Sequence, residues 1–82
     1  MANAREGKIF GETLRRLRTE RGWTQEDLAD AAHLTTTYVG QVERGDKVPS
    51  LTVVLKLARG LSVRPGELLT GFSPAVLKAL RL

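Results

Sequence analysis

The sequence predicts an all-α fold, a compact five-helix bundle that contains a helix-turn-helix and could end in a short extra C-terminal helix. Three observations support this class. Apolar residues recur at intervals of three and four rather than two. Glycine and proline divide the chain at regular intervals, as expected between helices. With 82 residues, the chain has the length of one small domain.

The first predicted helix covers residues 8–21. Its apolar residues Phe10, Leu14 and Leu17 fall on one helical face. Gly22 follows where a left-handed C-terminal cap belongs. The preceding residues 1–7 are expected to form a flexible basic arm.

The second and third predicted helices are short and joined by a tight turn. Thr24 and Asp27 have the spacing of a capping box at the start of the second helix. Thr35 is the predicted N-cap of the third helix, which ends near Gly45. Two helices of about two turns, connected by a turn over residues 33–35, match the dimensions of a helix-turn-helix. His33 is expected in the left-handed conformation within this turn.

The fourth and fifth predicted helices complete a domain over residues 8–71. Ser50 caps the fourth helix and Pro65 suits the first position of the fifth, which Gly71 stops. Ser73-Pro74 repeats a helix start signal within the tail, residues 72–82. The face of the fourth helix expected to be buried comprises Leu51, Val54, Leu55, Ala58 and Leu61.

The composition excludes several functions. Cysteine is absent and histidine occurs once, so no cofactor and no metal site is expected. The chain also lacks a phosphate-cradling glycine loop and a carboxylate pair flanked by a pocket signal, so an enzyme is not expected. Without an apolar run of about 20 residues or a signal-peptide pattern, no membrane association is expected and the cytoplasm is the expected compartment. The net charge of +4 favours a polyanionic partner.

An ordered set of motifs over residues 9–69 resembles the lambda-repressor-like, or XRE-type, helix-turn-helix family. The short length and the Thr37-Tyr38 pair are similar to controller proteins of restriction–modification systems. The resemblance implies a sequence-specific transcriptional regulator that binds double-stranded operator DNA and often controls its own promoter. The matching motifs are Leu14-Arg15-x-Leu17-Arg18, Thr24-Gln25-Glu26-Asp27-Leu28-Ala29, Leu34, Thr37-Tyr38-Val39, Val42-Glu43-Arg44-Gly45, Pro49-Ser50-Leu51 and Leu61-x-Val63.

The resemblance also implies roles for individual polar residues. Gln25, at the start of the second helix, would contact a DNA phosphate, and the alternative is a solvated helix residue. Arg44 and Lys47 would contact the DNA backbone after the third helix, although Lys47 could instead be a solvated loop residue. Arg18 and Glu43 would form a salt bridge that holds the third helix against the first.

The outward face of the third helix is assigned by elimination, because Val39 and Val42 take the core face. A glutamine amide can pair with adenine and a threonine methyl group can contact thymine, so the predicted DNA site contains A·T pairs. Tyr38 could alternatively cover the turn. Gly40 is unexpected within a helix, which leaves either close approach to DNA or simple tolerance. The predicted base-contacting residues are Thr36, Thr37, Tyr38 and Gln41.

The C-terminal part of the chain carries more apolar residues than a core of this size needs. We expect them to form a homodimer interface, since family members read two half-sites about 34 Å apart. Two alternatives remain: the tail folds back onto its own domain, or it binds another protein, as an antitoxin binds its toxin. The predicted interface residues are Val63, Leu69, Phe72, Val76, Leu77 and Leu80.

Overall fold

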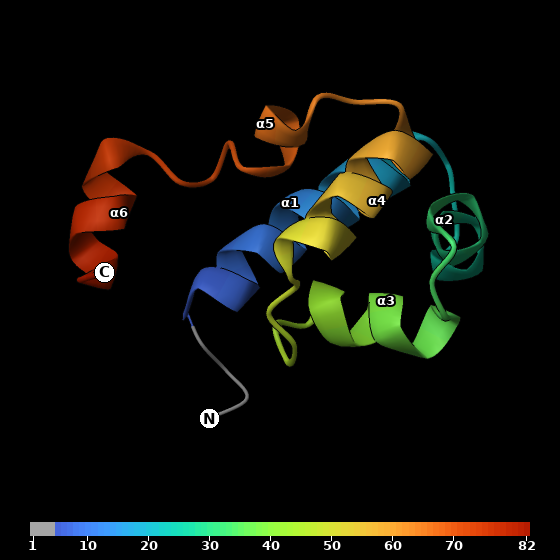
Figure 1. Cartoon of the computed structure of the whole chain (residues 1–82), viewed down its shortest axis with the longest axis horizontal. Helices are drawn as coiled ribbons and strands as arrows, with labels where there is room; N and C mark the ends of the chain where they lie inside the picture. Colours follow the sequence, from blue (N-terminus) through green and yellow to red (C-terminus); the bar gives the residue numbers. More distant parts are fainter. Residues whose placement is uncertain (1–4) are drawn as a thin grey trace.

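The computed structural model describes residues 5–82, and this part of the chain forms six helices without a β-strand (Figure 1). The all-α class, the five-helix bundle and the extra C-terminal helix are therefore confirmed. In chain order the helices are α1 (Arg5–Glu20), α2 (Gln25–Ala32), α3 (Thr36–Glu43), α4 (Leu51–Leu61), α5 (Pro65–Leu68) and α6 (Pro74–Leu80).

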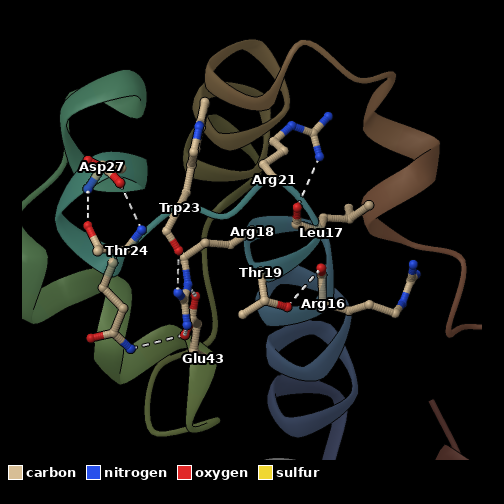
Figure 2. A network of polar contacts seen from close by, with 10 residues as sticks. Arg16, Leu17, Arg18, Thr19, Arg21, Trp23, Thr24, Asp27 and Glu43 are labelled. Atoms are coloured by element: carbon tan, nitrogen blue, oxygen red, sulfur yellow. Dashed lines mark hydrogen bonds and ion pairs between the residues drawn. The ribbon is translucent and has the colours of Figure 1, made fainter.

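Side-chain caps begin four of these helices at the predicted residues. Thr24, Thr35, Ser50 and Ser73 each accept a hydrogen bond from the backbone N–H three residues later, at 3.0–3.2 Å. At α2 the cap is reciprocal, because the Asp27 carboxylate accepts from the N–H of Thr24 at 2.9 Å (Figure 2). These bonds satisfy N–H groups that have no partner within a helix, which is why the starts can be read locally.

Left-handed residues follow most of the described helices. Gly22 has a φ of 70° after α1, and His33 has a φ of 57° as the C-cap of α2, as predicted for both positions. Ser62 ends α4 in the same conformation. Arg21 then joins two of these ends, because its guanidinium donates to the carbonyl oxygens of Leu17 at 3.0 Å and Leu61 at 2.8 Å.

The start of α1 differs from the prediction. The helix begins at Arg5, three residues before the expected start at Lys8. Gly7 is buried in its first turn, where an added Cβ would lie 3.2 Å from the carbonyl oxygen of Gly45. Packing against the loop after α3 thus extends the helix, and residues 5–7 are not part of a flexible arm. Residues 1–4 of the expected arm lie outside the described residues.

The buried face of α4 is also rotated from the predicted one. Leu51 and Leu55 are 73% and 48% exposed, contrary to the expectation that both face the core. Leu57, which the sequence pattern did not select, is 1% exposed. The buried face of α4 includes Val54, Leu57 and Leu61. Leu51, the first residue of the helix, therefore points toward solvent.

Two glycines allow the backbones of the bundle to approach closely. An added Cβ at Gly11 would contact the carbonyl oxygens of Val42 and Glu43, where α1 crosses α3. At Gly60 it would lie 3.0 Å from the Ala31 carbonyl carbon and the Ala32 nitrogen, where α4 packs on α2. The core enclosed by α1–α5 consists of Phe10, Leu14, Leu17, Leu28, Ala29, Ala32, Val39, Val42, Val54, Leu57, Ala58, Leu61 and Leu68.

Helix α6 stands apart from this bundle at the end of an extended linker (Figure 1). None of its seven residues is buried in the described part of the chain. Its one side-chain hydrogen bond to α1 among the described residues joins Arg5 Nη1 to the carbonyl oxygen of Ala79 at 3.3 Å. Over residues 5–82, every helix is too short or too polar to cross a bilayer.

Candidate nucleic-acid interface

Helices α2 and α3 pack together across the turn at residues 33–35. The turn is closed by a hydrogen bond from the N–H of Leu34 to the carbonyl oxygen of Ala29, at 2.8 Å. The left-handed His33 reverses the chain at the end of α2, and Thr35 caps the start of α3. Local backbone geometry therefore fixes how α3 leaves the turn.

One face of α3 is buried and the other is open. Val39 and Val42 are each 1% exposed, whereas Thr36 and Thr37 lie in solvent. Gln41 is half-buried and shares the outward side with the two threonines, as the helical period requires. The structure thus brings three of the four predicted base-contacting residues together on one helical surface.

The fourth residue, Tyr38, lies differently. Its side chain is half-buried and packs against the core cluster. With His33, Leu34, Thr35 and Val53, it lines an apolar hollow beside the turn. This position agrees with the alternative in which Tyr38 covers the turn.

A buried polar network fixes α3 against α1 and α2 (Figure 2). Arg18 binds Glu43 with two hydrogen bonds, from Nε at 2.7 Å and from Nη2 at 3.0 Å. Its Nη1 also donates to the carbonyl oxygen of Trp23 at 2.8 Å. The side chains of Arg18 and Glu43 are only 11% and 3% exposed. The salt bridge that the resemblance implies is therefore present, in the bidentate form that arginine and carboxylate favour.

Gln25 belongs to the same network, which the sequence did not indicate. Its Nε2 donates to Glu43 Oε1 at 3.0 Å, so the side chain is held between α2 and α3. The amide retains a second N–H and its carbonyl oxygen for other partners. A contact to phosphate from this position would therefore start from a fixed side chain rather than a mobile one.

Cations gather around the loop that follows α3. Arg44 and Lys47 are exposed, and Arg44 Nε is paired with Asp46 Oδ2 at 3.1 Å. Lys8 of α1, which was not assigned to the site, lies against this loop. Its Cγ would be 2.6 Å from a Cβ at Gly45, whose φ of 82° suits glycine. No sequence signal links Lys8 to the loop, because their proximity depends on how α1 packs.

The predicted dimer-interface residues do not share one environment. Val63 and Phe72 pack partly against the core, whereas Leu69 and Leu77 are 45% and 43% exposed. Leu69, Phe72 and Leu77 line an apolar hollow between the bundle and α6. The remaining two, Val76 and Leu80, are half-buried on α6.

Similarity to known proteins identifies the family to which this helix-turn-helix belongs. The profile of the helix-turn-helix family matches residues 14–68, which is more than half of the chain and includes α2, the turn and α3. The chain belongs to the helix-turn-helix family. This membership confirms the resemblance predicted from the motifs.

Relatives within this family are named as regulators. The transcriptional regulator SutR of Escherichia coli is 36% identical over 56 residues, which cover 68% of this chain but 32% of SutR, so the chain spans about a third of that protein. The control protein C.BamHI of Bacillus amyloliquefaciens is 36% identical over 62 residues, covering 74% of this chain and 76% of C.BamHI. These names place the chain among helix-turn-helix transcriptional regulators.

A solved structure agrees in both sequence and fold. The restriction–modification controller protein C.AhdI from Aeromonas hydrophila shares 48% identity and superimposes with a TM-score of 0.75. The match covers 77% of this chain and 96% of C.AhdI. The likeness to controller proteins therefore extends over nearly the whole of a controller chain.

Proposed function

We propose that this helix-turn-helix protein regulates transcription by binding an operator as a homodimer, with α3 in the major groove. The observation that carries the proposal is the division of α3 into a core face and an outward face. Val39 and Val42 anchor the helix, while Thr36, Thr37 and Gln41 remain available at its surface. A helix presented in this way fits the width of the major groove.

The outward side chains have the chemistry to distinguish bases. The amide of Gln41 can pair with N6 and N7 of adenine, and the methyl groups of Thr36 and Thr37 can contact thymine. Tyr38 is a weaker candidate because the core and the turn occupy part of its surface. We therefore assign base reading first to these three residues and expect A·T pairs at the positions they contact.

Binding to the DNA backbone would come from Gln25, Arg44 and Lys47. Arg44 and Lys47 are exposed cations in the loop directly after α3. Gln25 stands at the first position of α2, where the helix dipole favours an anion. Such contacts hold the protein in register on DNA and make its affinity fall as the salt concentration rises.

The proposed dimer would form through the apolar residues of the C-terminal part. Helix α6 has no fully buried residue in the described part of the chain, which leaves apolar surface of the tail available to a second copy. Leu69, Phe72 and Leu77 expose apolar surface beside it. Pairing two copies here would bury this surface and place two α3 helices on successive half-sites.

Occupation of an operator would act sterically, by blocking RNA polymerase or by presenting a surface that recruits it. Since controller proteins are among the relatives, autoregulation of the protein's own promoter in the cytoplasm is part of the proposal. Protein concentration and dimerisation would then set the regulatory response, because a dimer dissociates at low concentration.

A second candidate is a protein-interaction module such as an antitoxin, whose C-terminal segment binds a partner. The same observation favours it, because α6 presents Val76, Leu77 and Leu80 without burying them. Co-purification of a stoichiometric partner that α6 variants lose would support this function. DNA binding through α3 could coexist with it.

Selection of binding sites from a random duplex pool tests the main proposal. A palindromic consensus with half-site centres about 34 Å apart is expected of a dimeric operator reader. Retesting the selected duplexes across a salt series separates base reading from charge attraction. Steeply salt-dependent binding with no consensus would contradict sequence-specific regulation.

A further inference from the structure

Gly40 occupies a position on α3 where a side chain would be expected. It lies one helical turn after Thr36 and one turn before Arg44, in a row along the outward face. Glycine within a helix is less favourable than alanine. Despite its place on the outward face, Gly40 is buried. Other side chains therefore cover it.

The covering side chains come from two candidate DNA-backbone contacts. A Cβ built on Gly40 would lie 3.2 Å from Arg44 Nη1 and 3.4 Å from Gln25 Oε1. The first distance is tighter than an ordinary van der Waals contact, and the second is ordinary. Both polar groups thus converge above the same glycine, although Gln25 begins α2 and Arg44 follows α3, 19 positions later.

Each of these side chains is held from its other side. Asp46 Oδ2 accepts from Arg44 Nε at 3.1 Å, and Glu43 Oε1 accepts from Gln25 Nε2 at 3.0 Å. The Arg44 guanidinium keeps further N–H donors, and the Gln25 amide keeps one. Two sets of donors are therefore gathered at one place beside the base-reading residues.

We infer that Gly40 is a positioning residue for DNA binding, because the missing side chain lets Arg44 lie beside Gln25 so that both bind one phosphate. The inference rests on the proposed function, since it concerns how the same surface holds the DNA backbone. Arg44 Nη1 and Gln25 Nε2, which are both donors, lie 3.2 Å and 3.7 Å from the Cβ position built on Gly40, so a single phosphate can reach donors of both side chains. Arginine and an amide together offer the directional donors that phosphate oxygens favour.

The test is a pair of substitutions, Gly40→Ala and Gly40→Met, measured on a selected operator duplex and on a scrambled duplex of equal length. Alanine should raise the melting temperature, because it is the better helix former. It should nevertheless weaken binding to both duplexes about tenfold, as expected for the loss of a hydrogen bond to a charged group. Methionine, which fills the gap, should weaken binding further.

A salt series distinguishes this role from a purely structural one, because a structural defect alone would leave the salt dependence of DNA binding unchanged. Losing one cation from the phosphate backbone should reduce the slope of log K against log salt by about one. Gly40→Ala should also have no further effect in an Arg44→Ala background, because both changes remove the same contact. The matched control is Gly66→Ala, where an added Cβ would meet no described atom within 4 Å.

The inference is overturned if Gly40→Ala binds DNA as tightly as the parent protein with the same salt slope. It is also overturned if the loss is equally large in the Arg44→Ala background. If the parent protein selects no consensus, the proposed function fails instead. A parent protein that selects an operator, together with an unaffected Gly40→Ala variant, would refute this inference alone.

Discussion

Glu43 shows how one side chain can connect three helices. Its buried carboxylate on α3 accepts hydrogen bonds from Arg18 of α1 and Gln25 of α2. Removing water from a carboxylate is costly, and the paired guanidinium offsets much of that cost. The pair therefore matters most when one partner is lost, because the other is then left charged and nearly buried.

Glu43→Ala should lower the free energy of unfolding by about 3 kcal/mol, the lower end of the range for breaking a buried pair. Weaker DNA binding should follow as a secondary effect, since Gln25 loses its anchor. Thermal and denaturant unfolding measure the change. Glu20→Ala is the matched control, because Glu20 pairs with Arg16 while both side chains are more than half exposed. Its expected loss is below about 1 kcal/mol.

Equal stabilities of the Glu43→Ala variant and the parent protein would show that the pair does not hold α3 in place. The Arg18–Glu43 pair could be anticipated from the family resemblance. The bond from Gln25 could not, because it depends on the angle at which α2 meets α3. The position of Tyr38 depends on that same packing. The sequence alone therefore could not decide whether Tyr38 contacts a base or covers the turn.

At the level of helices, start signals were the most predictable feature. Thr24, Thr35, Ser50 and Ser73 act as caps through bonds that span only three residues, so no tertiary information is needed. The predicted start of α1 and the predicted buried face of α4 were wrong, because both features depend on tertiary contacts. For α1 the contact is with Gly45, and for α4 the face follows Leu57.

Close packing of α1 on α3 predicts a strong effect at Gly11. In Gly11→Ala, the new Cβ would lie 2.5 Å from the carbonyl oxygen of Glu43, a backbone atom that cannot move alone. We expect the free energy of unfolding to fall by about 3 kcal/mol, at the upper end of typical overpacking costs. Circular dichroism during thermal unfolding measures this loss.

Gly66→Ala serves as the control for that experiment, since the same chemical change there meets open space. It should leave the stability unchanged or slightly higher. If both glycine variants unfold at the temperature of the parent protein, α1 and α3 are not in the close contact described.

At the scale of the whole molecule, the bundle and its tail differ in burial. Residues of α1–α5 enclose the core, whereas α6 buries none of its residues in the described chain. Sequence could predict that α6 exists, because Ser73 and Pro74 mark its start. It could not decide where α6 packs, because that depends on surfaces that only the folded bundle, or a second copy, provides.

Leu77→Glu should shift the protein from dimer to monomer at concentrations where the parent protein is dimeric. A charge placed in the apolar hollow with Leu69 and Phe72 would lack a partner in a buried interface. Sedimentation equilibrium, with and without operator DNA, measures the mass. Leu55→Glu is the control, because Leu55 is similarly exposed, at 48%, but lies on α4.

A parent protein that remains monomeric at high micromolar concentration, both free and on DNA, would exclude the dimer. A dimer that persists in Leu77→Glu but dissociates in Leu55→Glu would show that the interface lies on α4 instead. Both outcomes would leave the proposed base reading by α3 intact.

Base reading by α3 is tested most directly by repeating the binding-site selection in parallel for the parent protein, Gln41→Ala and Lys47→Ala. The parent protein should select a palindrome with an A·T pair in each half-site that Gln41→Ala no longer prefers, a change of about 1–3 kcal/mol at that pair. Lys47→Ala should select the same sequence with a shallower salt dependence. If Gln41→Ala selects the parental consensus unchanged, or the parent protein selects none, α3 does not read DNA as described.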